Sequence, residues 1–544
     1  MFRTILKRTL AVQITALLGI PGLVKAGETV PPPLTPVVGT AEGAIQGVKN
    51  DGIDAFLGIA YAAAPIGERR FMPPEPPRPW QGIWDATALG APCMQMNYLE
   101  REYRDPVFTR QMQLLFPTLT EKKTDNEDCL FLNVWTPAAG DGGSRPVMLW
   151  IHGGGYAYGS GGWPAYDGRN LAARGDVVVV TVNHRLNAFG YLPLAEKFGD
   201  AYAQSGNLGQ LDLIRALQWV QDNIASFGGD PGNVTIMGES GGGSKVSHLL
   251  ATPSARGLFH KAIIQSGAGI EAADPVEMQM LSDELLADLG VTSEEELRAV
   301  PAEQLLDSAS AIVARVHKGY NSPNFRPVLD GVVMPRHPFT PDAPEMARDI
   351  PVMIGWNKDE MTFFNASQPW FGKLDEAGFE RLVTAFGPHG KALAKAYRTA
   401  NPGYSLSHIA NRAMAASFID RTYQLADRKA DQGGAPVYVY RLDWETPVNH
   451  GDLKSPHMLE IPLMFDNVEQ GRPFVGPGTE PQVIADMMSD AWIAFARSGT
   501  PATGRLPKWE AYDSGNRMVM LFDLKPRMAS DPEGIIREAL ATAK

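Results

Sequence analysis

Cysteine is nearly absent from this chain: its 544 residues include only Cys93 and Cys129. Neither belongs to a C-x-x-C pair or lies near a pair of histidines, which argues against a metal site. Two alternatives stay open, a pair of buried free thiols or one disulfide. A disulfide between the two cysteines would suit an oxidising compartment. It would close a 36-residue loop and stabilise the fold by about 3–4 kcal/mol.

Positive charge is also in deficit. Lysine and arginine total 49 against 61 acidic residues, a net charge of −12. We therefore expect neither nucleic acid nor anionic membrane surfaces as partners, because both bind through clusters of positive charge. The apolar content of 44% and the charged content of 20% are ordinary for a soluble globular protein.

Long apolar runs, internal repeats and low-complexity blocks do not stand out after residue 26. Within 1–26, basic residues precede the short apolar run "TLAVQITALLGIPGLV", and the segment ends at Ala26 in a pattern typical of a cleavage site. It predicts a signal peptide cleaved after Ala26, export to the periplasm or the extracellular medium, and no stable membrane anchor afterwards. The alternative is an uncleaved anchor. We expect 27–544 to form a single domain, since elaborated α/β folds reach this length.

The hydrophobic pattern predicts the fold class. Short runs rich in β-branched residues recur at 147–151, 177–182, 234–237, 262–265, 352–356, 437–442 and 519–523. Runs that are apolar throughout suit parallel strands covered on both faces. Between the second and third runs, 211–227 has apolar residues at helical spacing. The sequence therefore predicts an α/β protein with a doubly wound, mostly parallel sheet.

The stretch "MGESGGGSKVS" at 237–247 fits two motifs. Gly238 and Gly243 have the spacing of a phosphate-binding loop, but that motif needs lysine directly after the second glycine and then Ser or Thr. Here Ser244 precedes Lys245, so both functional groups are displaced. We therefore do not favour a nucleotide site.

The same stretch forms G-x-S-x-G around Ser240, between a predicted strand and a predicted helix, which is the context of a nucleophile elbow. The backbone N–H of Gly241 would then face a developing oxyanion at a helix N-terminus. The glycines Gly153–Gly155 follow the run 147–151, as in the HGGG type of oxyanion hole. Gly154 and Gly155 are the expected further donors, whereas a simple tight turn is the alternative.

These motifs resemble the type-B carboxylesterases, the cholinesterase-like family of the α/β-hydrolase fold. The resemblance extends along nearly the whole chain after the signal segment. It rests on "FLGIAYAAAPIGERRF", "EDCLFLNVWTP", "YDGRNLAARGDVVVVTVNHRL", "ALQWVQDNIASFGGDPGNVTIMGES" and "FARSGTPATGRLPKWEAYD". It implies an α/β-hydrolase fold with helical insertions, a Cys93–Cys129 disulfide, and a structural salt bridge between Arg70 and Glu127. It also implies hydrolysis of small-molecule carboxylic esters through an acyl-enzyme, with no cofactor or metal.

A serine nucleophile needs a histidine base, which in this fold follows the acid in the chain. The family pattern is His, Gly, any residue, Glu and then an apolar stretch, and His457 with Glu460 matches it. The departure is Met458, where the family has glycine, so the local loop shape stays open. His450 is the alternative base, since it has the following glycine but not the later residues.

The resemblance also implies the acid and its neighbours. The family's glutamate matches Glu360, just after the run 352–356, with Asp359 beside it. Glu239 corresponds to a buried glutamate next to the nucleophile, and Ser266 to a serine that supports the acid. Gly241 stands where alanine is usual, a change that retains the N–H donor but makes the turn less stiff.

The loop between the cysteines, where the family has part of its gorge rim, mixes aromatic and basic residues: Tyr98, Tyr103, Phe108, Phe116, Arg101, Arg104 and Arg110. The family's choline-site tryptophan would lie in this loop, which contains no tryptophan, so a cholinesterase is disfavoured. Amide or lactone hydrolysis by the same residues stays open. So does a catalytically silent, adhesion-like member of the fold, although such members typically lack the serine. The sequence does not determine an oligomeric state.

Overall fold

A computed structural model describes residues 32–96, 125–316, 324–387 and 389–542. The predicted signal peptide, and the aromatic and arginine residues expected at the gorge rim, lie outside the described residues. In the described part, eleven strands form one sheet and three short strands, β1 (Val38–Gly39), β2 (Ala44–Gln46) and β5 (Ile83–Asp85), form another. In spatial order the large sheet comprises β14 (Arg527–Ser530), β13 (Met518–Phe522), β12 (Val437–Leu442), β11 (Val352–Asn357), β10 (Lys261–Gln265), β9 (Gly229–Glu239), β7 (Arg145–Ile151), β8 (Val178–Val182), β6 (Phe131–Thr136), β4 (Ile53–Ala60) and β3 (Val48–Asn50).

The large sheet is parallel in its centre and antiparallel at both edges. Every neighbouring pair from β8 to β13 is parallel, whereas β14, β6, β4 and β3 pair antiparallel with their neighbours. Each predicted run is a strand, so the predicted mostly parallel α/β sheet is confirmed. In such a sheet the carboxyl ends of the parallel strands meet along one edge, which is where ligand sites form.

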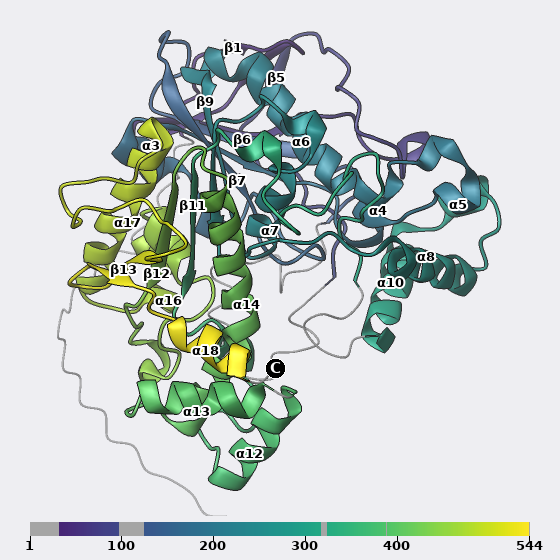
Figure 1. The fold of residues 1–544 in the computed structure, drawn as a ribbon. Coiled ribbons are helices and arrows are strands. Elements are labelled where there is room, and N and C mark those ends of the chain that lie inside the picture. Colours follow the sequence, from purple (N-terminus) through teal and green to yellow (C-terminus); the bar gives the residue numbers. More distant parts are fainter. Residues whose placement is uncertain (1–31, 97–124, 317–323, 388, 543–544) are drawn as a thin grey trace, which may run out of the picture.

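Both faces of the sheet are buried, as the apolar runs predict. In β7, Val147, Leu149 and Ile151 belong to one hydrophobic core, whereas Met148 and Trp150 belong to the other. The first core is covered by α6 (Leu208–Asn223), α7 (Gly241–Leu249) and α14 (Leu406–Asp431), and the second by α3 (Arg169–Gly175) and α17 (Glu480–Ser498) (Figure 1). A strand buried on both sides has no need for polar residues at alternate positions.

Helical insertions extend from this centre (Figure 1). One contains α8 (Pro275–Leu289) and α10 (Ala302–Val316), which share a third core with α4 (Asn187–Tyr191). Another contains α12 (Glu376–Ala385) and α13 (Gly390–Ala400), near the C-terminal α18 (Gly534–Thr542). The shorter helices are α5 (Ala195–Phe198), α9 (Glu294–Ala299), α11 (Met361–Asn365), α15 (Glu460–Met464) and α16 (Val468–Val475).

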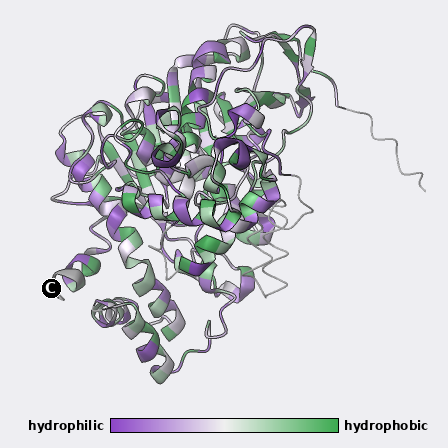
Figure 2. Cartoon of the chain, turned by 90° about the vertical axis from the view of Figure 1, so that its right-hand side faces the viewer, coloured by the Kyte–Doolittle hydropathy of each residue, from purple (hydrophilic) through white to green (hydrophobic). Residues whose placement is uncertain are grey.

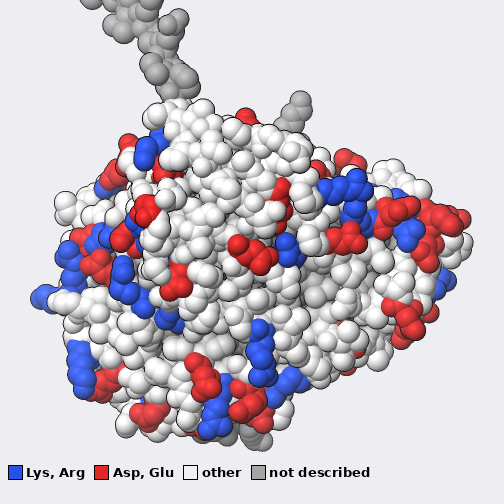
Figure 3. Space-filling view, turned by 90° about the horizontal axis from the view of Figure 1, so that it is seen from above, with Lys and Arg blue, Asp and Glu red and all other residues white. Residues whose placement is uncertain are grey.

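The outer surface is mixed in polarity and charge. The outer helices carry both hydrophilic and hydrophobic residues (Figure 2), as amphipathic helices packed on a core do. Acidic and basic side chains are interspersed on the face seen in Figure 3. None of the described helices is long and apolar enough to cross a membrane.

Candidate active site

Ser240 lies at the joint between β9 and α7. Its backbone has φ 56° and ψ −122°, a conformation that is strained for a residue with a side chain. The Ser240 N–H donates to the Gln265 carbonyl at 2.8 Å, and its carbonyl accepts from the Ser244 N–H at 3.0 Å. The strained turn is therefore held by hydrogen bonds on both sides. This is the strand–turn–helix context expected of a nucleophile elbow.

Close backbone packing explains the glycines around this turn. A Cβ on Gly242 would lie 2.0 Å from the Ile151 carbonyl oxygen, and one on Gly267 would lie 1.9 Å from the Ser240 carbonyl oxygen. No side chain fits at these distances. The glycine run therefore lets α7 approach the ends of β7 and β10 closely.

The predicted oxyanion loop follows β7 directly. Gly154 and Gly155 have φ values of 84° and 61°, in the region that favours glycine. The Gly155 carbonyl packs against Gly241, where a Cβ would lie only 2.1 Å from its oxygen. The fold thus brings together the three predicted oxyanion residues, Gly154, Gly155 and Gly241.

His457 and Glu360 form a buried pair. The imidazole Nδ1 lies 2.5 Å from Glu360 Oε2. The other carboxylate oxygen of Glu360 accepts from the Ser266 hydroxyl and from the Asn357 N–H, both at 2.7 Å. A carboxylate only accepts, so Nδ1 carries the proton. Nε2 is therefore the nitrogen that can act as the base when His457 is neutral. Glu360 therefore sets both the orientation and the tautomer of the ring.

The second ring nitrogen faces another acid. His457 Nε2 lies 3.0 Å from Glu239 Oε1. Burial alone would lower the pKa of His457, but the adjacent Glu239 and Glu360 outweigh it and raise this pKa well above its usual value. In the free protein the imidazole is therefore stabilised as a cation between two carboxylates. Glu239 directly precedes Ser240 in the chain, and it contacts Nε2, the nitrogen that would accept a serine proton.

A third carboxyl group lies nearby. Glu460 Oε2 accepts from Asn357 Nδ2 at 2.5 Å, and Oε1 accepts from Gln265 Nε2 at 3.4 Å. Burial, with the nearby Glu239 and Glu360, raises the pKa of Glu460 to about 8. The raised pKa favours the neutral form of Glu460, which limits the negative charge near the imidazole. The sequence marks Glu460 only as part of the histidine motif and does not indicate this role.

Among the residues that the structure describes, the alternative base, His450, and the neighbour of the acid, Asp359, make other contacts or none. His450 is exposed in the short 3-10 turn Val448–Gly451. The Asp359 carboxylate contacts the Tyr404 hydroxyl and the Ser455 N–H, each at 3.4 Å. Met458 has φ 71°, so the loop retains the left-handed conformation that the family's usual glycine favours.

Comparison with known proteins places the chain in a family. Residues 34–534 match the Carboxylesterase family. The chain belongs to this family. It is 35% identical to para-nitrobenzyl esterase from Bacillus subtilis over 517 residues, covering 93% of this chain and 99% of the relative. It is also 35% identical to phenmedipham hydrolase from Pseudarthrobacter oxydans over 500 residues, covering 89% and 94%.

A solved structure of a family member supports the fold as well. The Geobacillus stearothermophilus carboxylesterase EST55 matches with a TM-score of 0.78 and 40% identity, covering 92% of this chain and 99% of that chain. The protein is therefore a carboxylic ester hydrolase of the α/β-hydrolase fold.

Aromatic rings surround the imidazole of this carboxylesterase. The ring centroid of Phe364 lies 5.0 Å from that of His457, and those of Phe363 and Phe418 lie 6.2 Å away. Phe363 and Phe364 come from α11, and Phe418 from α14. The sequence does not single out these residues, because no short motif links α11 to α14.

Two pairings implied by the family resemblance are present. Cys93 and Cys129 are joined by a disulfide, so the free-thiol alternative is wrong. Arg70 Nε donates to Glu127 Oε2 at 2.7 Å, and Arg70 also donates to the Val300 carbonyl at 2.6 Å. Through these two contacts, Arg70 links Glu127, two residues before Cys129, to the segment between α9 and α10.

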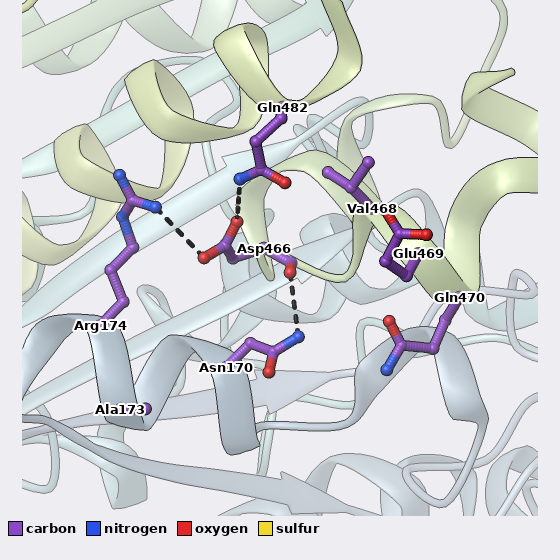
Figure 4. A pocket seen from close by; sticks show the side chains of 8 residues that line it. All are labelled: Asn170, Ala173, Arg174, Asp466, Val468, Glu469, Gln470 and Gln482. Atoms are coloured by element: carbon purple, nitrogen blue, oxygen red, sulfur yellow. Dashed lines mark hydrogen bonds and ion pairs between the residues drawn. The ribbon is translucent and has the colours of Figure 1, made fainter. Parts of the chain in front are cut away.

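A separate surface hollow contains none of the expected catalytic residues. Figure 4 shows how its side chains lie. It is lined by Asn170, Ala173, Arg174, Asp466, Val468, Glu469, Gln470 and Gln482. Arg174 already pairs with Asp466 at 3.2 Å and with Asp486 at 2.9 Å. The lining offers neither a serine nor a histidine, so we place the candidate active site at Ser240 instead.

Proposed function

We propose that this carboxylesterase is a secreted serine hydrolase in which Ser240, His457 and Glu360 form the catalytic triad. One observation carries the proposal: the buried 2.5 Å contact of His457 with Glu360 lies at the same sheet edge as the strained Ser240 turn. The strands β9, β10 and β11 are successive neighbours in the sheet, so Ser240, Ser266 and Glu360 all follow adjacent strand ends.

The triad would work through an acyl-enzyme. Neutral His457 takes the Ser240 proton at Nε2 as Oγ attacks the ester carbonyl carbon. The N–H groups of Gly154, Gly155 and Gly241 stabilise the tetrahedral oxyanion. His457 then protonates the departing alcohol, and water activated by the same nitrogen releases the acid. Glu360 holds the imidazole throughout and stabilises its cationic form.

A serine-reactive fluorophosphonate tests the nucleophile. We expect mass spectrometry of the labelled protein to place the adduct on the Ser240 peptide, with loss of esterase activity in proportion to labelling. Activity that persists without labelling of Ser240 would refute the triad. Absence of both labelling and hydrolysis would favour the adhesion-like alternative.

We further propose that the substrates are esters with an apolar or aromatic group. The phenylalanine rings at 5.0–6.2 Å from His457 offer apolar contact, and one sequence relative is named para-nitrobenzyl esterase. A panel of benzyl, short-chain, long-chain, choline and polycarboxylic esters, with matched amides and lactones, should give the highest kcat/KM for the benzyl ester. A preference for choline or polycarboxylic esters would contradict this substrate class, and a preference for amides or lactones would favour those hydrolase alternatives.

We also propose export with cleavage after Ala26. The composition of 1–26 and the Cys93–Cys129 disulfide support an oxidising destination. N-terminal sequencing of the exported protein should begin at Gly27. Recovery of intact Met1 in a membrane fraction would show an uncleaved anchor instead.

A further inference from the structure

Lys245 on α7 is a buried amine without an acidic partner. Its side chain is fully buried, and within the described ranges no carboxylate forms an ion pair with it. Burial alone lowers its pKa to about 7. An apolar residue would be less costly at such a position, so the contacts of this amine call for an explanation.

Those contacts are with the oxyanion loop. Lys245 Nζ donates to the Gly155 carbonyl at 2.7 Å and to the His152 carbonyl at 3.4 Å. The preceding residue of α7 also contacts the loop, because the hydroxyls of Ser244 and Tyr156 are hydrogen-bonded at 2.6 Å. Consecutive residues of the nucleophile helix therefore hold both ends of the glycine loop.

The Gly155 carbonyl is also enclosed from the other side. It occupies the space that a side chain at position 241 would need, since a Cβ there would lie 2.1 Å from its oxygen and 2.5 Å from its Cα. Gly241 and Lys245 thus make one arrangement: the glycine leaves room for the carbonyl, and the lysine holds it there.

We propose that Lys245 is a positioning residue that clamps the oxyanion loop onto the nucleophile helix. The hydrogen bond from Nζ holds the Gly155 carbonyl against α7, and so fixes the loop whose N–H groups would meet the oxyanion. The proposal rests on the proposed function and assigns a further residue to it. Lys245 itself touches no reacting atom.

The test compares Lys245→Met with a matched control, Lys429→Met. Lys429 on α14 is also buried, and its Nζ donates to the carbonyls of Arg348 at 3.0 Å and Ala435 at 3.1 Å, outside the candidate site. For Lys245→Met we expect kcat to fall about 10- to 100-fold with KM changed less than about threefold, because loop misplacement affects the transition state more than the bound substrate. For Lys429→Met we expect wild-type kcat and KM, although its Tm should fall about as much as that of Lys245→Met.

An inhibitor separates oxyanion stabilisation from general damage. A trifluoromethyl ketone forms a serine adduct that carries an oxyanion, so its affinity for Lys245→Met should fall in proportion to kcat/KM. The corresponding unfluorinated methyl ketone, which does not favour the adduct, should bind equally to wild type and variant. A folded Lys245→Met protein with wild-type kcat and ketone affinity would overturn the clamp.

Gly241→Ala tests the same carbonyl from the other side, and it keeps the proposal testable if Lys245→Met does not fold. The added Cβ should displace the Gly155 carbonyl and weaken ketone binding, although alanine is the usual family residue. In the Lys245→Met/Gly241→Ala double variant, either change already releases the Gly155 carbonyl. The two losses of ketone affinity should therefore be less than additive. Wild-type ketone affinity in Gly241→Ala, or full additivity, would refute the arrangement. Failure of the ketone to modify Ser240 in wild type would instead refute the proposed function.

Discussion

At the scale of single residues, the two carboxylates on either side of His457 differ in what else they bind. Glu360 accepts from Ser266 and Asn357 as well as from the imidazole, so its position is fixed independently of the ring. In the described part of the chain, Glu239 has the His457 ion pair but accepts no other hydrogen bond. We infer that Glu360 orients the ring and that Glu239 mainly adjusts its charge.

Removal of the triad residues should show that they act together. We expect Ser240→Ala and His457→Ala each to lower kcat by about 10⁵- to 10⁶-fold, and the double variant to be no worse, because either change disables the same proton-coupled attack. Glu360→Gln should cost about 10⁴-fold or less, since the imidazole loses its orientation and its counter-ion. Steady-state kinetics with matched circular-dichroism spectra would measure this.

His450→Ala is the control for that series, because His450 is exposed and outside the site. It should retain wild-type turnover. If His450→Ala were inactive while His457→Ala kept normal turnover, the assignment of the base would be wrong.

The charge of Glu239 should set the pH dependence of the enzyme. His457 must be neutral to accept the Ser240 proton, so a raised His457 pKa moves the acidic limb of the kcat/KM profile to higher pH. Glu239→Gln removes one of the negative charges that raise this pKa, so the limb should move to lower pH. A limb that stays in place, or moves to higher pH, would contradict the charge role of Glu239.

At the scale of elements, the site depends on how closely α7 joins β9 and packs on β7. The strained Ser240 turn persists because backbone contacts from β7 and β10 surround it. A local turn motif alone would not hold this conformation, since strain of this kind costs about 1–3 kcal/mol. The neighbouring strands supply the contacts that offset it.

Gly242→Ala should break this joint, whereas Gly504→Ala should not. A Cβ at 242 would lie 2.0 Å from the Ile151 carbonyl oxygen, whereas one at 504 would meet nothing within 4 Å. We expect Gly242→Ala to lower the free energy of unfolding by about 3 kcal/mol or more. Gly504→Ala should leave it unchanged or raise it by about 0.4–1 kcal/mol, because alanine restricts the unfolded chain. Urea titration of both variants provides the measurement, and equal midpoints would contradict the close-packing argument.

At the scale of the whole molecule, the Cys93–Cys129 disulfide and the Arg70–Glu127 ion pair are among the links between parts of the chain that are distant in sequence. Arg70 lies between Glu127, beside Cys129, and the carbonyl of Val300. These links hold the cysteine region against the insertion that contains α9 and α10. The strand ends that hold Ser240 and Glu360 belong to the sheet and do not depend on this link.

Loss of the disulfide should therefore affect stability more than chemistry. The bond closes a 36-residue separation, so Cys93→Ser/Cys129→Ser should lower the free energy of unfolding by about 3–4 kcal/mol. The kcat of the remaining folded protein should stay near the wild-type value. Wild type reduced with dithiothreitol should match the double variant in urea. An unchanged unfolding midpoint in both would show that the link contributes little.

Much of this protein follows from local sequence. Each apolar run became a strand because a strand buried on both faces requires continuous apolar residues, and Ser240 could be placed because an elbow needs small residues within a few positions. His457 and Glu360 were matched through the family's motifs, and the structure places the two side chains together. The antiparallel edges formed by β14, β6, β4 and β3 were not predicted, since their pairing depends on distant partners.

Only the tertiary structure decided how the matched residues act on one another. The sheet order β12, β11, β10, β9, β7 does not follow from any single segment, yet it brings Glu239 and Glu360 to one imidazole. The raised pKa values of His457 and Glu460 and the three phenylalanine rings beside the imidazole all result from tertiary packing. For Lys245, the sequence shows only that its position does not fit a phosphate-binding loop. Its contact with Gly155 exists because α7 packs on the end of β7. The backbone preferences of a turn act over a few residues and can be read locally. Close packing, desolvation and charge coupling depend on which distant groups the packed sheet brings within a few ångströms.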